Sequence, residues 1–154
     1  MAEITSPQIK LIRNSVSINA PKEKVWELLT TTEYTEDWYT EFCPGGVNNK
    51  VDWKQGGRAV FTDNTGFGMI GKIKTWKPNE ALVFEFDGQI KDGKEDFDSP
   101  EAKSLKGAQE RYKLTEQNGQ TRLDIEADMN AEYFDMMSDA WERALQKVKV
   151  LAEK

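Results

Sequence analysis

The sequence predicts an α+β fold in which one curved antiparallel sheet wraps around a long C-terminal helix, in the order β-α-α-β6-α. Residues 47–128 form a series of short β-type segments joined by tight turns, and such connections make successive strands antiparallel neighbours. Residues 133–152 carry a wide apolar stripe that needs a concave partner. The length of 154 residues suits one domain, and we expect its core to span about residues 10–152.

The first elements are a strand and two short helices. Residues 10–18 alternate between apolar and polar side chains, the period-2 pattern of a half-buried strand. Pro21 then suits the first position of a helix whose apolar stripe runs to Leu29. A second short helix is predicted at residues 33–39, and the glycine pair at residues 45–46 ends this region.

The middle of the chain predicts a meander of six strands. Gly, Pro and Asn clusters separate its β-type segments, and the Asn118-Gly119 pair is a strong hairpin signal because both residues tolerate a positive φ. The predicted strands are residues 47–54, 58–64, 67–77, 81–88, 108–117 and 120–128.

The chain ends in the predicted long helix. Asn130 can cap it, and the apolar pattern continues to Ala152. Met136 falls outside the apolar stripe and is expected near a flank. The stripe consists of Tyr133, Phe134, Met137, Ala140, Trp141, Ala144, Leu145, Val148, Leu151 and Ala152.

Three segments carry a resemblance to a known family. They are residues 18–29, with the sequence INAPKEKVWELL, the glycine pair at 45–46, and residues 141–145, with the sequence WERAL. Together with the order of elements they resemble the START-like (SRPBCC) superfamily, and within it the family named after homologues of the activator of the heat-shock-protein-90 ATPase. The resemblance implies a helix-grip fold with a pocket for hydrophobic small molecules. It also implies two less common roles, since some members are enzymes and the eukaryotic activator binds a chaperone.

Composition narrows the classes of partner and location. The net charge of −6 and the absence of histidine argue against a nucleic-acid partner, which needs a basic surface, and against anionic membranes. No apolar run is long enough for membrane insertion, and the N-terminus lacks a signal-peptide pattern. Cys43 is the single cysteine, which suits a reducing compartment. We therefore expect a cytoplasmic protein.

The sequence contains no motif for a reaction, a metal or a cofactor. Without histidine, Ser–His and Cys–His catalysis and imidazole metal sites are excluded in their usual forms. Asp124, Glu126 and Asp128 alternate on one strand, but the apolar residues between them take the inward face. These acids are expected to point to water, and neither catalytic residues nor a cofactor are predicted.

Glu110 is the polar residue expected to face inward, because it shares a strand face with Tyr112 and Leu114. A buried carboxylate needs a partner, a raised pKa or a wet pocket, and Asn14 and Asn49 share the inward phases of their own strands. Alternatively, Glu110 lies near the sheet end and reaches solvent. Each aromatic candidate is by itself also consistent with plain core. The predicted pocket residues are Asn14, Trp38, Asn49, Phe61, Met69, Phe84, Glu110, Tyr112, Met137 and Trp141.

Residues 89–106 are rich in charge and poor in apolar side chains, and we expect them to be structureless. They could form a lid over the pocket or a solvated connection. For the whole chain the leading hypothesis is non-enzymatic binding of a hydrophobic, lipid- or polyketide-like small molecule. The alternatives are a protein-interaction or co-chaperone-like module, including a homodimer, and an enzyme on a similar substrate with Glu110 as acid or base.

Overall fold

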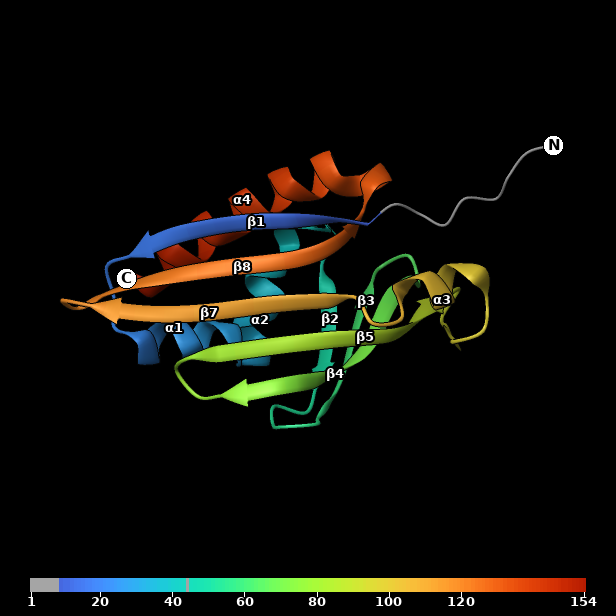
Figure 1. Cartoon of the computed structure of the whole chain (residues 1–154), viewed down its shortest axis with the longest axis horizontal. Helices are drawn as coiled ribbons and strands as arrows, with labels where there is room; N and C mark the ends of the chain where they lie inside the picture. Colours follow the sequence, from blue (N-terminus) through green and yellow to red (C-terminus); the bar gives the residue numbers. More distant parts are fainter. Residues whose placement is uncertain (1–8, 44) are drawn as a thin grey trace.

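The computed structural model describes residues 9–43 and 45–154; Pro44 and residues 1–8, where the sequence predicts no signal peptide, lie outside the described residues. An antiparallel sheet in the order β1-β8-β7-β5-β4-β3-β2 forms its centre, with β6 pairing β5 beside this path (Figure 1). This confirms the predicted curved antiparallel sheet. The strands are β1 (Ile9–Ile18), β2 (Val47–Val51), β3 (Arg58–Asp63), β4 (Gly68–Lys77), β5 (Ala81–Lys91), β6 (Lys94–Asp96), β7 (Gln109–Gln117) and β8 (Gln120–Asn130).

Three helices lie on one side of the sheet, with the longest one crossing behind β1 in Figure 1. They are α1 (Lys22–Leu29), α2 (Thr32–Trp38) and α4 (Phe134–Ala152). A 3-10 turn, η1 (Tyr39–Glu41), continues α2. Both predicted short helices and the long C-terminal helix are therefore confirmed, although Pro21 stands just before α1 in an extended conformation rather than inside it.

The sheet bends around these helices at irregular pairing between β4 and β5. The register shifts between Ile70 and Gly71 and again between Ile73 and Thr75. Such bulges bend a strand and increase its twist. Gly71 fits the first of them because a Cβ there would lie 2.4 Å from the carbonyl oxygen of Glu85. A close backbone approach thus helps to form the concave face.

The β7–β8 hairpin forms at the predicted turn. Gln117 pairs with Gln120, and the two residues between them have positive φ, 55° at Asn118 and 78° at Gly119. The Asn-Gly pair adopts this conformation at low cost, which fixes the register along both strands. Through that register Glu110 lies opposite Ala127.

Helix α4 buries the predicted stripe from its second turn onward. Asn130 caps the 3-10 turn η2 (Ala131–Tyr133) rather than α4 itself, and its Oδ1 accepts a bond from the Glu132 amide. The prediction that Tyr133 belongs to the apolar face of the helix is wrong, because Tyr133 precedes α4 and is 48% exposed. Met136, which falls outside the predicted stripe, is 61% exposed. The fully buried positions are Ala140, Trp141, Ala144, Leu145, Val148 and Ala152.

The expectation that residues 89–106 are structureless is wrong. Strand β5 continues to Lys91, β6 pairs back on it, and helix α3 (Pro100–Leu105) follows. Asp96 organises the segment, because its carboxylate accepts bonds from the amides of Asp98 and Ser99, the Ser99 hydroxyl and the Gln89 side chain. These bonds, led by that of the Ser99 hydroxyl, hold the pKa of Asp96 well below its usual range.

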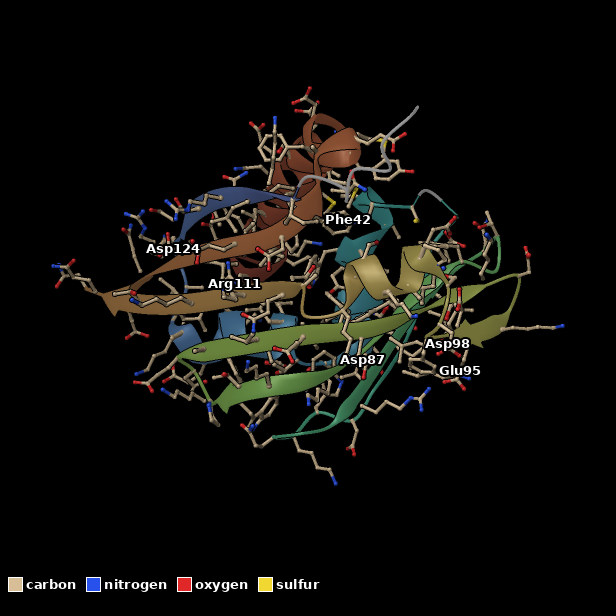
Figure 2. The ribbon with its side chains drawn as sticks, turned by 45° about the vertical axis from the view of Figure 1, so that its right-hand side comes forward. Phe42, Asp87, Glu95, Asp98, Arg111 and Asp124 are labelled. Carbon is tan, nitrogen blue, oxygen red and sulfur yellow. The ribbon has the colours of Figure 1, made fainter. Side chains whose placement is uncertain are left out.

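The convex face of the sheet is charged. Figure 2 shows Arg111 and Asp124 on neighbouring strands of this face. Arg111 lies 3.3 Å from Glu126, and Arg122 lies 2.9 Å from Asp124. The three alternating acids of β8 therefore face outward among arginines, as the strand period predicts.

Candidate functional site

The space between the sheet and α4 is filled by a cluster of aromatic side chains. Trp38 from α2, Tyr112 from β7 and Trp141 from α4 meet there, with ring centroids 6.5 Å apart for Trp38–Tyr112 and 5.9 Å for Tyr112–Trp141. Phe84 joins from β5, 6.2 Å from Tyr112, and Phe61 from β3, 5.4 Å from Phe84. Five predicted pocket residues thus come from five different elements and form one contiguous buried cluster.

Met69 and Met137 lie at the margin of this cluster. Both are partly buried and pack against the core, Met69 at the start of β4 and Met137 near the start of α4. Strand β7 also begins at this end of the sheet, on the right in Figure 1. A long, unbranched methionine side chain adapts to irregular space. The margin of the cluster is therefore lined by side chains that adapt to a neighbour more easily than the rings do.

Glu110 faces inward, as its strand phase predicts, and two tyrosines hold it. The hydroxyl of Tyr112 donates a 2.6 Å hydrogen bond to Glu110 Oε2, and the hydroxyl of Tyr39 donates one to the same oxygen at 3.3 Å. The two hydroxyl oxygens are 3.5 Å apart. Tyr39, Glu110 and Tyr112 form a polar triad on the aromatic cluster.

The surroundings of the triad disfavour charge. Burial raises the pKa of Glu110 to about 7, and the bonds from Tyr112 and Tyr39 offset only part of this effect. Burial, followed by the nearby Glu110 carboxylate, raises the pKa of both tyrosines well above 10. Near neutral pH the triad therefore holds one carboxyl that exchanges a proton and two hydroxyls that stay protonated.

The two predicted asparagine partners of Glu110 do not bind it. Asn14 is partly buried, but its Oδ1 accepts the amide of Ser15 on its own strand. Asn49 is buried, and its Nδ2 donates to the Thr35 hydroxyl at 2.7 Å. In the sheet order Asn14 lies two strands from β7 and Asn49 four strands, and tyrosines supply the contacts to Glu110 instead.

Tyr39 was missed by the sequence reasoning. It lies in the 3-10 turn η1, where neither the helical nor the strand period assigns a face to a side chain. Its contact with Glu110 joins residues 71 positions apart. The one local signal that Tyr39 faces inward is its position directly after the buried Trp38 at the end of α2.

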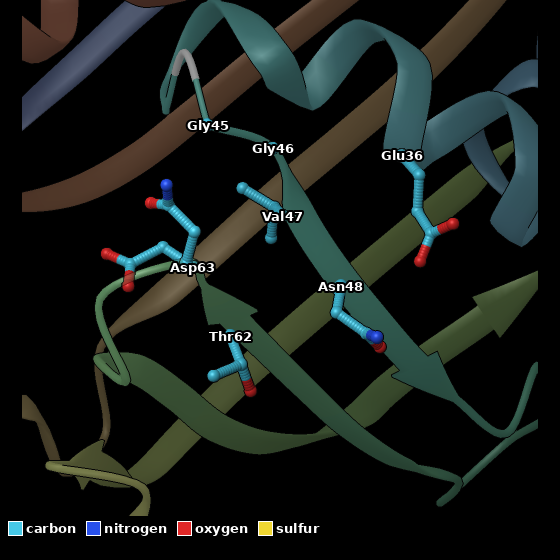
Figure 3. A pocket seen from close by; sticks show the side chains of 8 residues that line it. Glu36, Gly45, Gly46, Val47, Asn48, Thr62 and Asp63 are labelled. Carbon is cyan, nitrogen blue, oxygen red and sulfur yellow. The ribbon is translucent and has the colours of Figure 1, made fainter.

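Two surface hollows lie away from the aromatic cluster, and neither is lined by a predicted pocket residue. The first has a volume of about 390 Å³ and lies between α2 and the start of β2 (Figure 3). Its two carboxylates already serve the fold, because Glu36 accepts the Asn49 amide and Asp63 accepts the Thr65 amide. The second, of about 650 Å³, is lined by Lys50, Val51, Asp52, Arg58, Val60, Ile90 and Glu95.

Two further features are absent from the described residues. No three His, Cys, Asp or Glu side chains in residues 9–43 and 45–154 are grouped so that they could hold a metal ion. None of the helices in the same ranges combines the length and the apolar character that crossing a bilayer requires.

The family model described as Activator of Hsp90 ATPase homolog 1-like protein matches residues 19–153. No curated protein matches the chain. Among solved structures, protein MLL2253 from Mesorhizobium loti is 17% identical with a TM-score of 0.71, over 92% of this chain and 96% of that one. The Aha1 dimer from Colwellia psychrerythraea, solved in solution, is 20% identical with a TM-score of 0.68, over 94% and 96%.

A third solved structure is similar over part of its length. DynU16, a protein in the dynemicin biosynthetic locus, is 15% identical with a TM-score of 0.63, and the match covers 93% of this chain but 48% of DynU16. At these identities the three structures support the fold. They agree with the helix-grip arrangement that the sequence predicts.

Proposed function

Because this chain belongs to the Activator of Hsp90 ATPase homolog 1-like family, we propose that it binds a hydrophobic small molecule between the sheet and α4 without catalysing a reaction. The START-like fold commonly serves this purpose. A lipid- or polyketide-like ligand is the class we propose, and the similarity to a protein of the dynemicin biosynthetic locus supports it. A cytoplasmic location is part of the same proposal.

The observation that carries the proposal is the inward-facing Glu110 on an aromatic cluster. Removing a carboxyl from water costs free energy, and an apolar side chain would fill the same place without that cost. Ligand sites combine a mostly apolar lining with a few placed polar groups. Glu110, Tyr39 and Tyr112 supply such polar groups, and the surrounding rings supply the lining.

The ligand needs room, and the margin of the cluster can provide it. Met69 and Met137 are partly buried at the end of the sheet where β7 begins. Their side chains can change rotamer at small cost, which opens a path toward Glu110 while the rings behind stay in place. We propose that the ligand enters at this end.

A neutral fluorescent probe tests the proposal. N-phenyl-1-naphthylamine should bind the native protein at about one molecule per chain and quench Trp38 and Trp141, which border the proposed site. Native mass spectrometry of freshly purified protein should reveal a co-purified ligand. If probe fluorescence rises only near the unfolding midpoint, the core of the native protein is closed to ligands and the proposal is wrong.

Two adjacent methionines give a matched pair of variants. Met137→Trp places a larger side chain at the proposed entrance and should reduce probe affinity at least tenfold. Met136→Trp adds the same bulk to a side chain that is 61% exposed, and affinity should stay within about twofold. Equal effects of the two variants would mean that the ligand does not enter at Met137.

Self-association is a second candidate function. Ile9, Tyr133 and Met136 are large apolar side chains that are 50%, 48% and 61% exposed, and the similar Colwellia structure is a dimer. Sedimentation velocity of the protein and of Met136→Glu tests this candidate. A dimer that the variant converts to monomer supports it, and a monomer at all concentrations rejects it.

A further inference from the structure

One oxygen of the Glu110 carboxylate is left without a partner. Both tyrosine hydroxyls donate to Oε2, and in the described part of the chain Oε1 forms no hydrogen bond. Among the described residues, Asn49 Oδ1 is a fully buried side-chain oxygen without a partner. Oε1 of Glu110 differs from it, because it keeps some exposed surface. Since Glu110 as a whole is partly exposed, Oε1 is an acceptor that a ligand can reach.

The same carboxylate lacks a positively charged neighbour. No lysine or arginine of the described residues forms an ion pair with Glu110, and no cation contributes to its pKa. The cations on the surrounding elements are paired elsewhere: Arg143 with Glu41, Lys147 with Asp37, and Arg111 with Glu126. The inward face of the sheet therefore holds an acid whose charge no lysine or arginine of the described residues balances.

The walls next to this acid are aromatic. Tyr39 packs edge-on against Phe42, with centroids 5.6 Å apart, and Phe42 lies 4.9 Å from Trp141. Tyr112 lies 5.9 Å from the same tryptophan. The face of an aromatic ring attracts a cation, most strongly where water is excluded. A carboxylate and several rings together match an ammonium group.

We propose that the ligand is a hydrophobic amine whose ammonium group binds Glu110 Oε1 while its apolar body lies between the sheet and α4. This inference rests on the proposed function and names the chemical class of its ligand. A neutral hydroxyl would satisfy Oε1 but leave the charge unbalanced, and a fatty acid would add a second negative charge. The net charge of −6 also favours the approach of a cation.

The proposal predicts how binding depends on pH. Glu110 faces the hydroxyls of Tyr39 and Tyr112, and across the strands it faces Phe84 and Ala127, which do not titrate. Both tyrosine pKa values lie well above 10. Between pH 6 and 8 the group at this site that changes charge is Glu110, with a pKa of about 7. Affinity for an alkylamine should rise about tenfold over this range, following the fraction of ionised carboxylate.

The experiment compares three probes that share one tail: octylamine, 1-octanol and octanoate. Each is titrated into the protein at pH 6 and pH 8, below its aggregation concentration, with binding followed by calorimetry and by amide NMR shifts. Glu110→Gln keeps the shape of the side chain and removes its charge. Asp124→Asn removes a carboxylate from the convex face and controls for attraction to the acidic surface.

We expect octylamine to bind at least tenfold more tightly than 1-octanol at pH 8 and to release a proton when it binds at pH 6. Glu110→Gln should abolish this preference and leave 1-octanol affinity within about threefold, whereas Asp124→Asn should keep the preference. If 1-octanol or octanoate equals octylamine, the amine inference fails while the proposed function stands. If no probe binds, the proposed function fails as well. The pH series on the unaltered protein decides the matter even if Glu110→Gln does not fold.

Discussion

The Tyr112 hydroxyl donates a 2.6 Å hydrogen bond to Oε2 of Glu110, two residues earlier on the same strand. On an extended strand these residues share a face, so the bond follows directly from the pleat. The bond from Tyr39 is longer, and together the two do not compensate for the burial of the carboxylate, because the pKa of Glu110 stays near 7.

The stability of the protein should depend on the ionisation of Glu110. In the unfolded chain a glutamate has an ordinary pKa of 4.5, whereas here burial raises it to about 7. The stabilisation from keeping the proton is fully present below about pH 4 and is lost as the pH rises through about 7. Moving the pKa from 4.5 to about 7 corresponds to about 3 kcal/mol.

Glu110→Gln stays neutral and avoids this loss. The free energy of unfolding of the variant, minus that of the unaltered protein, should therefore increase by about 3 kcal/mol between pH 4 and pH 8. Urea unfolding at pH 4, 6 and 8 measures it, with Asp124→Asn as the surface control. A difference that stays constant with pH would contradict the burial of Glu110.

Removing the tyrosine hydroxyls should raise the pKa of Glu110 further, since both bonds lower it. Tyr112→Phe removes the 2.6 Å bond and should have the larger effect; Tyr39→Phe removes the 3.3 Å bond and should have the smaller one. The carboxyl carbon of Glu110, followed by ¹³C NMR titration, reports each pKa directly. The reverse order, or a fall in either variant, would refute the bonding scheme.

Much of the fold could be predicted because local patterns determine it. The Asn118-Gly119 turn and the apolar stripe ending at Ala152 depend on conformational preference and period alone. Residues 89–106 could not be predicted in this way. Their order rests on polar bonds to Asp96, and hydropathy does not detect such bonds.

In the candidate site, too, local patterns predict which way a strand residue faces but not which distant residue it contacts. Strand phase correctly placed Glu110 on the inward face, because its neighbour Tyr112 is apolar enough to mark that face. Phase also placed Asn49 inward, but could not identify its partner as Thr35. Tyr39 was missed because a contact across 71 residues depends on how α2 docks on the sheet, which no local pattern encodes.

Trp141 should be a principal contributor to stability. Its side chain is 1% exposed and contacts Trp38, Phe42 and Tyr112. Trp141→Ala should lower the free energy of unfolding by about 3–5 kcal/mol, because it removes buried apolar surface and leaves a cavity. Met136→Ala, on the same helix but largely exposed, should change it by less than about 0.5 kcal/mol. Urea denaturation compares the two, and equal losses would mean that α4 does not pack as described.

Two glycines test how the sheet is bent. At Gly71 an added Cβ would lie 2.4 Å from the backbone oxygen of Glu85, so Gly71→Ala should cost about 1–3 kcal/mol. At Gly88 the nearest obstacle, at 2.5 Å, is the ring of Phe97, a side chain that is 43% exposed, and the nearest backbone atom, the Asp96 oxygen, is 3.1 Å away. Gly88→Ala should therefore cost less than Gly71→Ala in thermal unfolding. The opposite ranking would show that the bulge tolerates a side chain.

One edge of β5 is shared by two partners: β7 pairs with it along residues 81–85, and β6 takes the same edge from Gln89 onward. After β6 the chain leaves the sheet, forms α3 and returns to the same edge of β5 as β7. A change in the length of the β5–β6 turn at Asp92-Gly93 thus shifts neither the β5–β7 nor the β7–β8 register. This makes the turn a natural position for evolutionary insertions, and a practical one for grafting a peptide or a fluorescent label without shifting the register of the strand that carries Glu110.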